Sequence, residues 1–283
     1  MEYKKLISIV EKKFSTEKIS EADLYISFDY QHIKFGVVID NRLQMLEHLY
    51  YYQGIKIEEW QDKLENVSKD FDFLAKKDWK NVYILPPLQA FTLIPKELFV
   101  ADNAFKYLQN VDNKIGNNPI ISNLQQSFEA VNVFNVPKSI YEWGKKNYTN
   151  VHFMHITEVF LNQIKDKNTQ KNSQMHIFVN EKYLSIAVLN EAQVQFCNVF
   201  EYKSSRDFLY FVLFILDELR LDKTNTAIKL YGQINQVAEI YRLLNNYVSQ
   251  LTLWEGAITI EMSEIFSHIT KLHYFDLWAM MKK

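Results

Sequence analysis

The chain has 283 residues, with 32 Lys or Arg and 34 Asp or Glu, so its formal net charge is −2. Nucleic-acid-binding proteins usually carry a basic excess or a basic stripe, and this sequence has neither. Its single cysteine, Cys197, excludes an internal disulfide framework and a cysteine-based zinc site. One cysteine also fits a reducing compartment.

Length and hydrophobicity together predict a cytoplasmic protein of two domains. At ~150 residues per domain, the chain corresponds to about two. The most apolar run, 208–216, is far shorter than the ~20 residues that span a bilayer. The first residues lack the apolar stretch and cleavage site of a signal peptide. We therefore expect no direct membrane span.

The N-terminal part is predicted to lead into an antiparallel meander. Residues 1–17 are compatible with a short amphipathic helix or with a loose tail. After them, apolar segments alternate with turn residues, including the pair Asp40-Asn41, which predicts three strands. These strands are expected at Leu24–Phe28, His32–Ile39 and Leu43–Tyr51.

Helices and short strands are predicted to follow. Apolar residues recur every three or four positions over 55–76, which is typical of an amphipathic helix. The stretch 110–123, rich in Asn, Gly and Pro, is predicted to connect two lobes. Pro137 suits a helix start, Thr157 could cap another helix, and 166–174 is a polar loop. The strands are expected at Val82–Leu85, Phe91–Ile94, Val131–Val136 and Val151–Ile156.

The order of elements then repeats. Three further strands precede a helix that Ser204 and Asp207 are spaced to cap, then a strand, another helix and a last strand. The five strands are expected at Met175–Val179, Tyr183–Leu189, Ala192–Tyr202, Ala227–Leu230 and Leu251–Trp254. A duplicated βββαβα unit favours two ribonuclease-H-like lobes. We expect lobe I at 1–128, lobe II at 129–260, and a C-terminal helix, 261–283, that returns to lobe I.

Four segments carry a resemblance to a known family: DLYISFDYQHIKFGVVIDN, VYILPPLQAFTLIPKELF, HIFVNEKYLSIAVLNEAQVQFCNVFEY and HYFDLWAMM. The chain resembles a Bacteroidetes family of uncharacterised proteins with a degenerate actin-like fold. The resemblance implies an α/β protein with the actin-like ATPase fold, in which each of two ribonuclease-H-like lobes has a mixed five-stranded sheet flanked by helices.

The actin-like superfamily binds a nucleotide between its lobes, with phosphates held by two Asp-x-Gly hairpin turns. Glycine lets backbone N–H groups approach the phosphates, and the aspartate orients Mg²⁺. The turns matched here are Asp29-Tyr30-Gln31 and Asn180-Glu181-Lys182, so both glycines are replaced. The adenosine turn keeps one of its two glycines, Gly232. The resemblance thus implies a vestigial nucleotide site at Asp29, Gln31, Asn180, Lys182 and Gly232.

Each of the other residues that could take part in catalysis or metal binding also has a purely structural explanation. Asp29 is either a remaining metal-orienting carboxylate or a turn residue bonded to its own backbone, and we favour the second. His152 and His155, three apart in a predicted strand, point to opposite faces and should not share a metal. Cys197 is expected to be a buried thiol. Acidic pairs at 58–59, 70–72 and 217–218 are expected on solvated helix faces.

Three functions remain open from the sequence. The first is a non-catalytic actin-like scaffold, with no cofactor, that binds a protein partner or itself; the run Tyr50–Tyr52 is a candidate contact. The second is a divergent ATPase or kinase that binds ATP with Mg²⁺. The third, nucleic-acid processing, needs several converging carboxylates that the sequence does not offer. We expect no catalytic residue, no metal site and no nucleic-acid partner.

Overall fold

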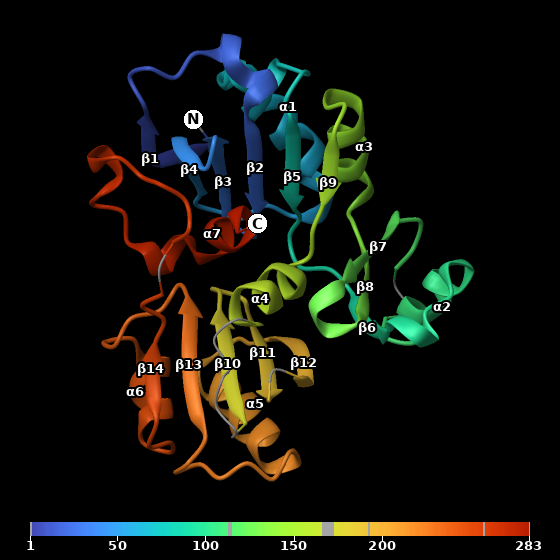
Figure 1. Cartoon of the computed structure of the whole chain (residues 1–283), viewed down its shortest axis with the longest axis vertical. Coiled ribbons are helices and arrows are strands. Elements are labelled where there is room, and N and C mark those ends of the chain that lie inside the picture. The colour runs from blue at the N-terminus through green and yellow to red at the C-terminus, as the bar shows by residue number, and fades with distance from the viewer. Residues whose placement is uncertain (1, 113–114, 166–172, 192, 257, 283) are drawn as a thin grey trace. The chain divides into compact units, whose positions relative to one another are not determined.

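The computed structural model describes residues 2–112, 115–165, 173–191, 193–256 and 258–282. The chain forms two compact lobes (Figure 1). The first lobe runs up to His155 and includes Thr259–Ile269, and the second lobe comprises Ile156–Ile258 and Thr270–Lys282. The division therefore falls after His155 and not at the expected 128/129 boundary.

The first lobe contains a six-stranded sheet of order β1-β4-β3-β2-β5-β9. Strands β2, β3 and β4 form the predicted antiparallel meander, and β5 and β9 run parallel to β2. Asp40 and Asn41 join β3 to β4 with φ of 47° and 61°, as a tight hairpin turn requires. The strands are β1 (Tyr3–Val10), β2 (Asp23–Phe28), β3 (His32–Ile39), β4 (Arg42–Tyr51), β5 (Asn81–Leu85) and β9 (Val151–Phe153).

Two helices pack together beside this sheet, α1 (Trp60–Asp70) and α3 (Lys138–Asn147). Trp60, Leu64 and Val67 of α1 are buried, and the Trp60 ring meets Phe28 of β2 edge-on at 5.1 Å. The helix predicted over 55–76 is shorter because Phe71 is extended; 3-10 turns flank it at Ile57–Glu59 and Asp72–Ala75. Pro137 is the N-cap of α3, which confirms the helix start.

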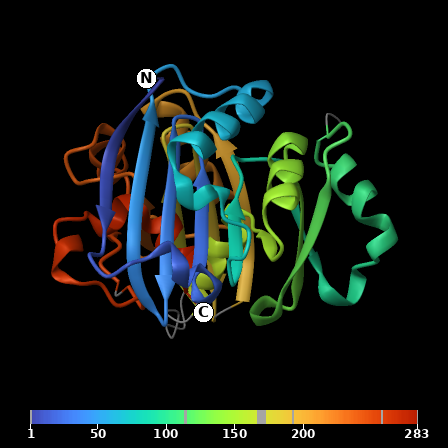
Figure 2. The same cartoon turned by 90° about the horizontal axis from the view of Figure 1, so that it is seen from above.

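A small three-stranded sheet in the first lobe lies on the β9 side of the main sheet (Figure 2). Its order is β6-β8-β7, and Leu108 of α2 packs on its buried residues. Its elements are β6 (Phe91–Pro95), β7 (Ile120–Gln125), β8 (Ala130–Asn135) and α2 (Ala104–Gln109). The prediction of an inter-lobe connection at 110–123 is wrong, because β7 begins at Ile120 and pairs with β8.

The second lobe contains a five-stranded sheet of order β12-β11-β10-β13-β14. Side chains of β10 alternate between the two faces of the sheet. On one face, Ile177 packs in a core with Phe208 of α5 and Leu244 of α6. On the other face, the ring of Phe178 lies near Phe160 of α4 and Phe275 of α7. The strands are β10 (Gln174–Val179), β11 (Tyr183–Asn190), β12 (Gln193–Glu201), β13 (Ala227–Gly232) and β14 (Leu251–Leu253). The helices are α4 (Ile156–Ile164), α5 (Ser205–Glu218), α6 (Glu239–Asn245) and α7 (Phe275–Met281).

The two sheets share one topology, which confirms the predicted duplication. Order β4-β3-β2-β5-β9 in the first lobe corresponds to β12-β11-β10-β13-β14 in the second, with the same parallel and antiparallel neighbours. Ser204 caps α5 by accepting the Asp207 N–H at 3.1 Å, as its spacing predicted. The sixth strand, β1, was not predicted: the segment expected to be a helix or a tail pairs antiparallel with β4.

The C-terminal segment is divided between the lobes. Thr259–Ile269 lies with the first lobe, where Asn41 Nδ2 donates to the Thr259 carbonyl at 3.0 Å. Helix α7 belongs to the second lobe and packs on α4. This differs from the expected long helix over 261–283, since α7 begins only at Phe275. No helix among the described residues has the length and apolarity to cross a membrane.

Candidate functional site

The first matched turn, Asp29-Tyr30-Gln31, joins β2 to β3. Asp29 is buried, and its Oδ1 accepts the N–H of Tyr30 at 2.6 Å. Its own N–H donates to the carbonyl of His32 at 2.8 Å, which closes the hairpin. The Asp29 carboxylate therefore bonds to its own turn, which is the usual role of aspartate at such positions.

Gln31 binds the first turn to the end of β4. Its Nε2 lies 3.3 Å from the Tyr50 hydroxyl and from the Tyr51 carbonyl oxygen, and 3.2 Å from that of Tyr52. The Tyr51 N–H donates back to the Gln31 carbonyl at 2.8 Å. Of the three tyrosines, Tyr51 is buried whereas Tyr52 is 63% exposed. Gln31, which stands at the position matched to a phosphate-binding glycine, thus uses its side-chain amide to hold the first turn against the end of β4.

The loop after β4 also fits closely against this turn. The N–H of Ile55 donates to the Tyr30 carbonyl at 2.7 Å. Gly54 has φ +72°, and a Cβ there would lie 2.4 Å from Cζ of Tyr30. The Tyr30 ring therefore occupies space that only a glycine leaves open.

The second matched turn, Asn180-Glu181-Lys182, joins β10 to β11. Asn180 Oδ1 accepts the N–H of Lys182 at 3.2 Å, and the Asn180 N–H donates to Tyr183 at 3.0 Å. The Tyr202 hydroxyl donates to the Asn180 carbonyl. The backbone N–H of Lys182, at the position matched to the second glycine, is thus bonded to the side chain that begins the turn.

Gly232 ends β13 beside this second turn. It pairs with Val179, which directly precedes Asn180, so the structure brings these two matched positions of the second lobe together. Its φ is +90°, and a Cβ would lie 2.2 Å from the Val179 carbonyl oxygen and 2.8 Å from the Phe178 ring. Local packing alone therefore requires glycine at this position.

The remaining candidate residues, two histidines and the cysteine, pack against neighbouring side chains or strands. His152 is exposed and stacks on Tyr83 at 5.2 Å, whereas His155 is buried between the rings of Phe91 and Phe134. Cys197 is half-buried, and desolvation raises the pKa of its thiol to about 12, which disfavours the reactive thiolate. Within the described ranges, no three His, Cys, Asp or Glu residues are grouped closely enough to hold a metal.

The buried His155 gives a pH-dependence that can be tested. Desolvation lowers its pKa to about 3, so the folded protein keeps this ring neutral while the unfolded chain protonates it near pH 6.5. Stability should therefore be lost as pH falls below about 6.5, by about 2 kcal/mol at pH 5 from this group. Urea unfolding of wild type and His155→Phe between pH 7.5 and 5 measures this loss.

The readout is the difference in pH slope between the two proteins, since other groups contribute to both. The matched control His152→Phe changes the exposed histidine three residues earlier. Equal slopes for wild type and His155→Phe would contradict this role of His155.

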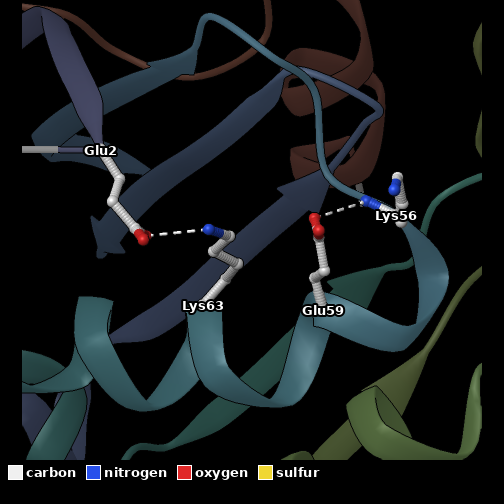
Figure 3. A network of polar contacts seen from close by, with 4 residues as sticks. All are labelled: Glu2, Lys56, Glu59 and Lys63. Atoms are coloured by element: carbon white, nitrogen blue, oxygen red, sulfur yellow. Dashed lines mark hydrogen bonds and ion pairs between the residues drawn. The ribbon is translucent and has the colours of Figure 1, made fainter.

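A hollow of about 440 Å³ adjoins the loop after β4 and was not predicted. Figure 3 shows its charged residues: the Lys63 ammonium forms an ion pair with Glu2 at 2.9 Å, and Glu59 accepts the Lys56 N–H at 3.1 Å. Glu2 precedes β1, so this hollow depends on the unpredicted pairing of β1 with β4. Because Lys63 is already paired with a carboxylate, the hollow does not present a free cluster of positive charge.

Comparison with known proteins identifies the family of the chain. A family described as "Protein of unknown function (DUF3822)" matches residues 11–251. The chain belongs to the DUF3822 family. No curated protein matches it.

Solved structures show the fold of this DUF3822 protein. A Bacteroides thetaiotaomicron protein with actin-like ATPase fold and unknown function superposes with a TM-score of 0.81. That match is 18% identical and covers 95% of this chain and 98% of the other. A chain of the PilM–PilN type IV pilus biogenesis complex gives 0.62, at 9% identity, covering 92% and 97%. The expected family resemblance and the actin-like ATPase fold are confirmed.

Proposed function

We propose that this DUF3822 protein is a non-catalytic actin-like scaffold or adaptor that acts in the cytoplasm by binding a protein partner. One observation carries the proposal: in each matched hairpin turn the first side chain accepts a backbone N–H of the turn, that of Tyr30 or that of Lys182, which a phosphate-binding turn would leave available. The chain has the actin-like fold, but in the two matched turns side chains occupy backbone groups that would otherwise bind phosphate.

Phosphate binding at such turns depends on access to the backbone. A phosphate oxygen is bound by backbone N–H groups that approach it without a Cβ in the way. In the first turn, Gln31 has a long side chain where the superfamily has a glycine without Cβ, and its amide bonds to the Tyr51 and Tyr52 carbonyl oxygens. In the second turn, the Lys182 N–H already has a side-chain acceptor, Asn180. A nucleotide would have to break these contacts in order to bind.

A neighbour in fold space supports a protein partner. The PilM–PilN structure is that of a complex in type IV pilus biogenesis, and its chain has a similar fold. In that complex, a chain with this fold is part of a protein assembly. We propose the same class of role, protein binding, for the present chain.

The second candidate function is a divergent nucleotide-binding ATPase or kinase. It is favoured by the presence of Asp29 in the first turn and of Gly232, with its positive φ, beside the second. Both residues have structural contacts that account for them, so we place this candidate second.

ATP hydrolysis by the purified protein with Mg²⁺ separates the two functions. We expect phosphate release at the level of a protein-free blank for wild type and for Asp29→Ala. The matched control is Asp102→Ala, which removes an exposed carboxylate of the same lobe. Turnover on the order of 1 per second, abolished in Asp29→Ala and kept in the control, would establish the enzyme and overturn the scaffold.

A further inference from the structure

Strand β12 forms one edge of the second-lobe sheet. It is nine residues long, with sequence QVQFCNVFE, and Gln193, Gln195, Asn198 and Glu201 are exposed. It pairs with β11 on one side, and no other strand of the described chain pairs with it. A long edge strand presents a row of backbone N–H and C=O groups to any further strand.

The first lobe shows what occupies the corresponding position. There β4 is the counterpart of β12, and β1 pairs with it antiparallel from Tyr3 to Val10. The same sheet position is therefore covered by an antiparallel strand in one lobe and by none of the described strands in the other. An antiparallel strand is the occupant that this topology accepts.

The sequence of β12 does not protect the edge. The first lobe ends its sheet with β1, which carries Lys4 and Lys5, a common means of preventing further pairing. β12 has neither Lys nor Pro, and Glu201 is its only charged residue. A bulge opposite Val188 and Leu189 leaves residues 196–201 in regular pairing with β11.

Aromatic side chains lie along this edge. Phe196 and Phe200 stack at 6.3 Å, and Phe200 stacks on Phe211 of α5 at 4.6 Å. Beside them, Tyr210 is 61% exposed and Phe214 is 41% exposed. A strand added here would extend the sheet and also cover part of this apolar surface.

The backbone direction along β12 is defined by its contacts. The Tyr202 N–H donates to the Lys182 carbonyl, on the β11 side. Because backbone groups alternate along a strand, those of Cys197, Val199 and Glu201 point to the outer edge. The Val199 N–H is bonded to the Asn198 side chain at 2.8 Å, in agreement with this direction.

We propose that β12 pairs antiparallel with β12 of a second copy of the chain, across a two-fold axis at Asn198. This register places Phe196 of each copy opposite Phe200 of the other, and the two Asn198 side chains opposite each other. Cys197 and Val199 then exchange the outward hydrogen bonds, and in doing so the Val199 N–H gives up its bond to the side chain of its own Asn198. Glu201 lies opposite Gln195, so no like charges meet and aromatic pairs face one another, as cross-strand pairing favours.

The proposal names a second copy as a partner of the proposed scaffold, and its test does not depend on ATP hydrolysis. A closed two-fold interface of this kind is isologous, so one substitution appears twice at the axis. Asn198→Asp places two carboxylates directly opposite each other, and Asn198→Lys places two ammonium groups there. Each should raise the dimer dissociation constant roughly tenfold or more.

Sedimentation velocity over a concentration series tests the proposal with the full chain. We expect wild type and the neutral control Asn198→Ser to dimerise, both charged variants to shift toward monomer, and their equimolar mixture to regain the dimer. Circular dichroism melts check that each variant is folded. A monomeric wild type at every concentration, or a dimer that neither charged variant weakens, would overturn the proposal and leave the edge to a different partner.

A second variant pair tests the hydrogen bonds separately from charge. Val199→Pro removes the outward N–H of residue 199 and leaves the N–H groups of the neighbouring residues, which face β11, in place. Val199→Ala is the control, because it keeps the N–H. The proline variant should be monomeric and the alanine variant dimeric. Equal dimerisation of the two would contradict pairing through the β12 backbone.

Discussion

Replacing Phe275 with alanine is expected to lower the free energy of unfolding of the second lobe by about 3–5 kcal/mol. Phe275 is completely buried and lies 4.9 Å from the ring of Tyr231, 5.2 Å from Trp254 and 5.6 Å from Phe178. Truncation removes these contacts and leaves a cavity where α7 meets the sheet. Chemical denaturation followed by tryptophan fluorescence measures the loss.

Hydrogen exchange by lobe makes this prediction specific to the second lobe. Amides of β10 and β13 should lose protection in Phe275→Ala, while those of β2 and β5 should keep it. Val237→Ala is the control, because Val237 is 77% exposed, and it should change neither set. Lost protection in β2 and β5 alone would place α7 with the first lobe, as the sequence had suggested.

Alanine at Gly232 is expected to destabilise the same lobe by about 3 kcal/mol. Two costs combine: a φ of +90°, which non-glycine residues rarely adopt, and a Cβ that would overlap the Val179 carbonyl oxygen. The Val179 carbonyl oxygen belongs to the backbone of β10, so it cannot rotate away as a flexible side chain could. The measurement is the urea midpoint of Gly232→Ala relative to wild type.

Gly116→Ala is the matched control, because it introduces the backbone strain of a positive φ without a steric overlap of the new Cβ. Gly116 also has positive φ, 62°, but it is exposed. Its substitution should cost about 1 kcal/mol. Equal effects at the two positions would show that the contact with Val179 contributes nothing.

The repeated meander was predictable because its signals are local. Alternating apolar residues bounded by turn pairs such as Asp40-Asn41 give the strands and their order, and the order of elements gives the duplication. By contrast, Leu6, Ile7 and Val10 have helical spacing, and only pairing with β4 makes the segment a strand. Likewise β7 has the polar sequence IISNLQ, and its structure depends on β8, which follows it in the chain.

For the candidate site, the resemblance supplied positions but no contacts. The resemblance located the turns, and the sequence showed that Gln31 and Lys182 replace glycines. It could not show that Gln31 bonds to carbonyl oxygens twenty residues later, since that contact requires the hairpin and the loop after β4 together. Likewise, the sequence could not show that β12 lies at the sheet edge, with no further described strand beside it, where β1 covers its counterpart β4.

We propose that the two matched turns hold no nucleotide, and thermal unfolding with and without Mg-ATP, Mg-ADP or Mg-GTP tests this proposal. A ligand that binds only the folded state adds about 2.7 kcal/mol at one hundred times its dissociation constant, and so raises the melting temperature. We predict an unchanged melting temperature with each nucleotide at millimolar concentration. A clear rise in melting temperature that Asp29→Ala removes would show that the turns bind a nucleotide.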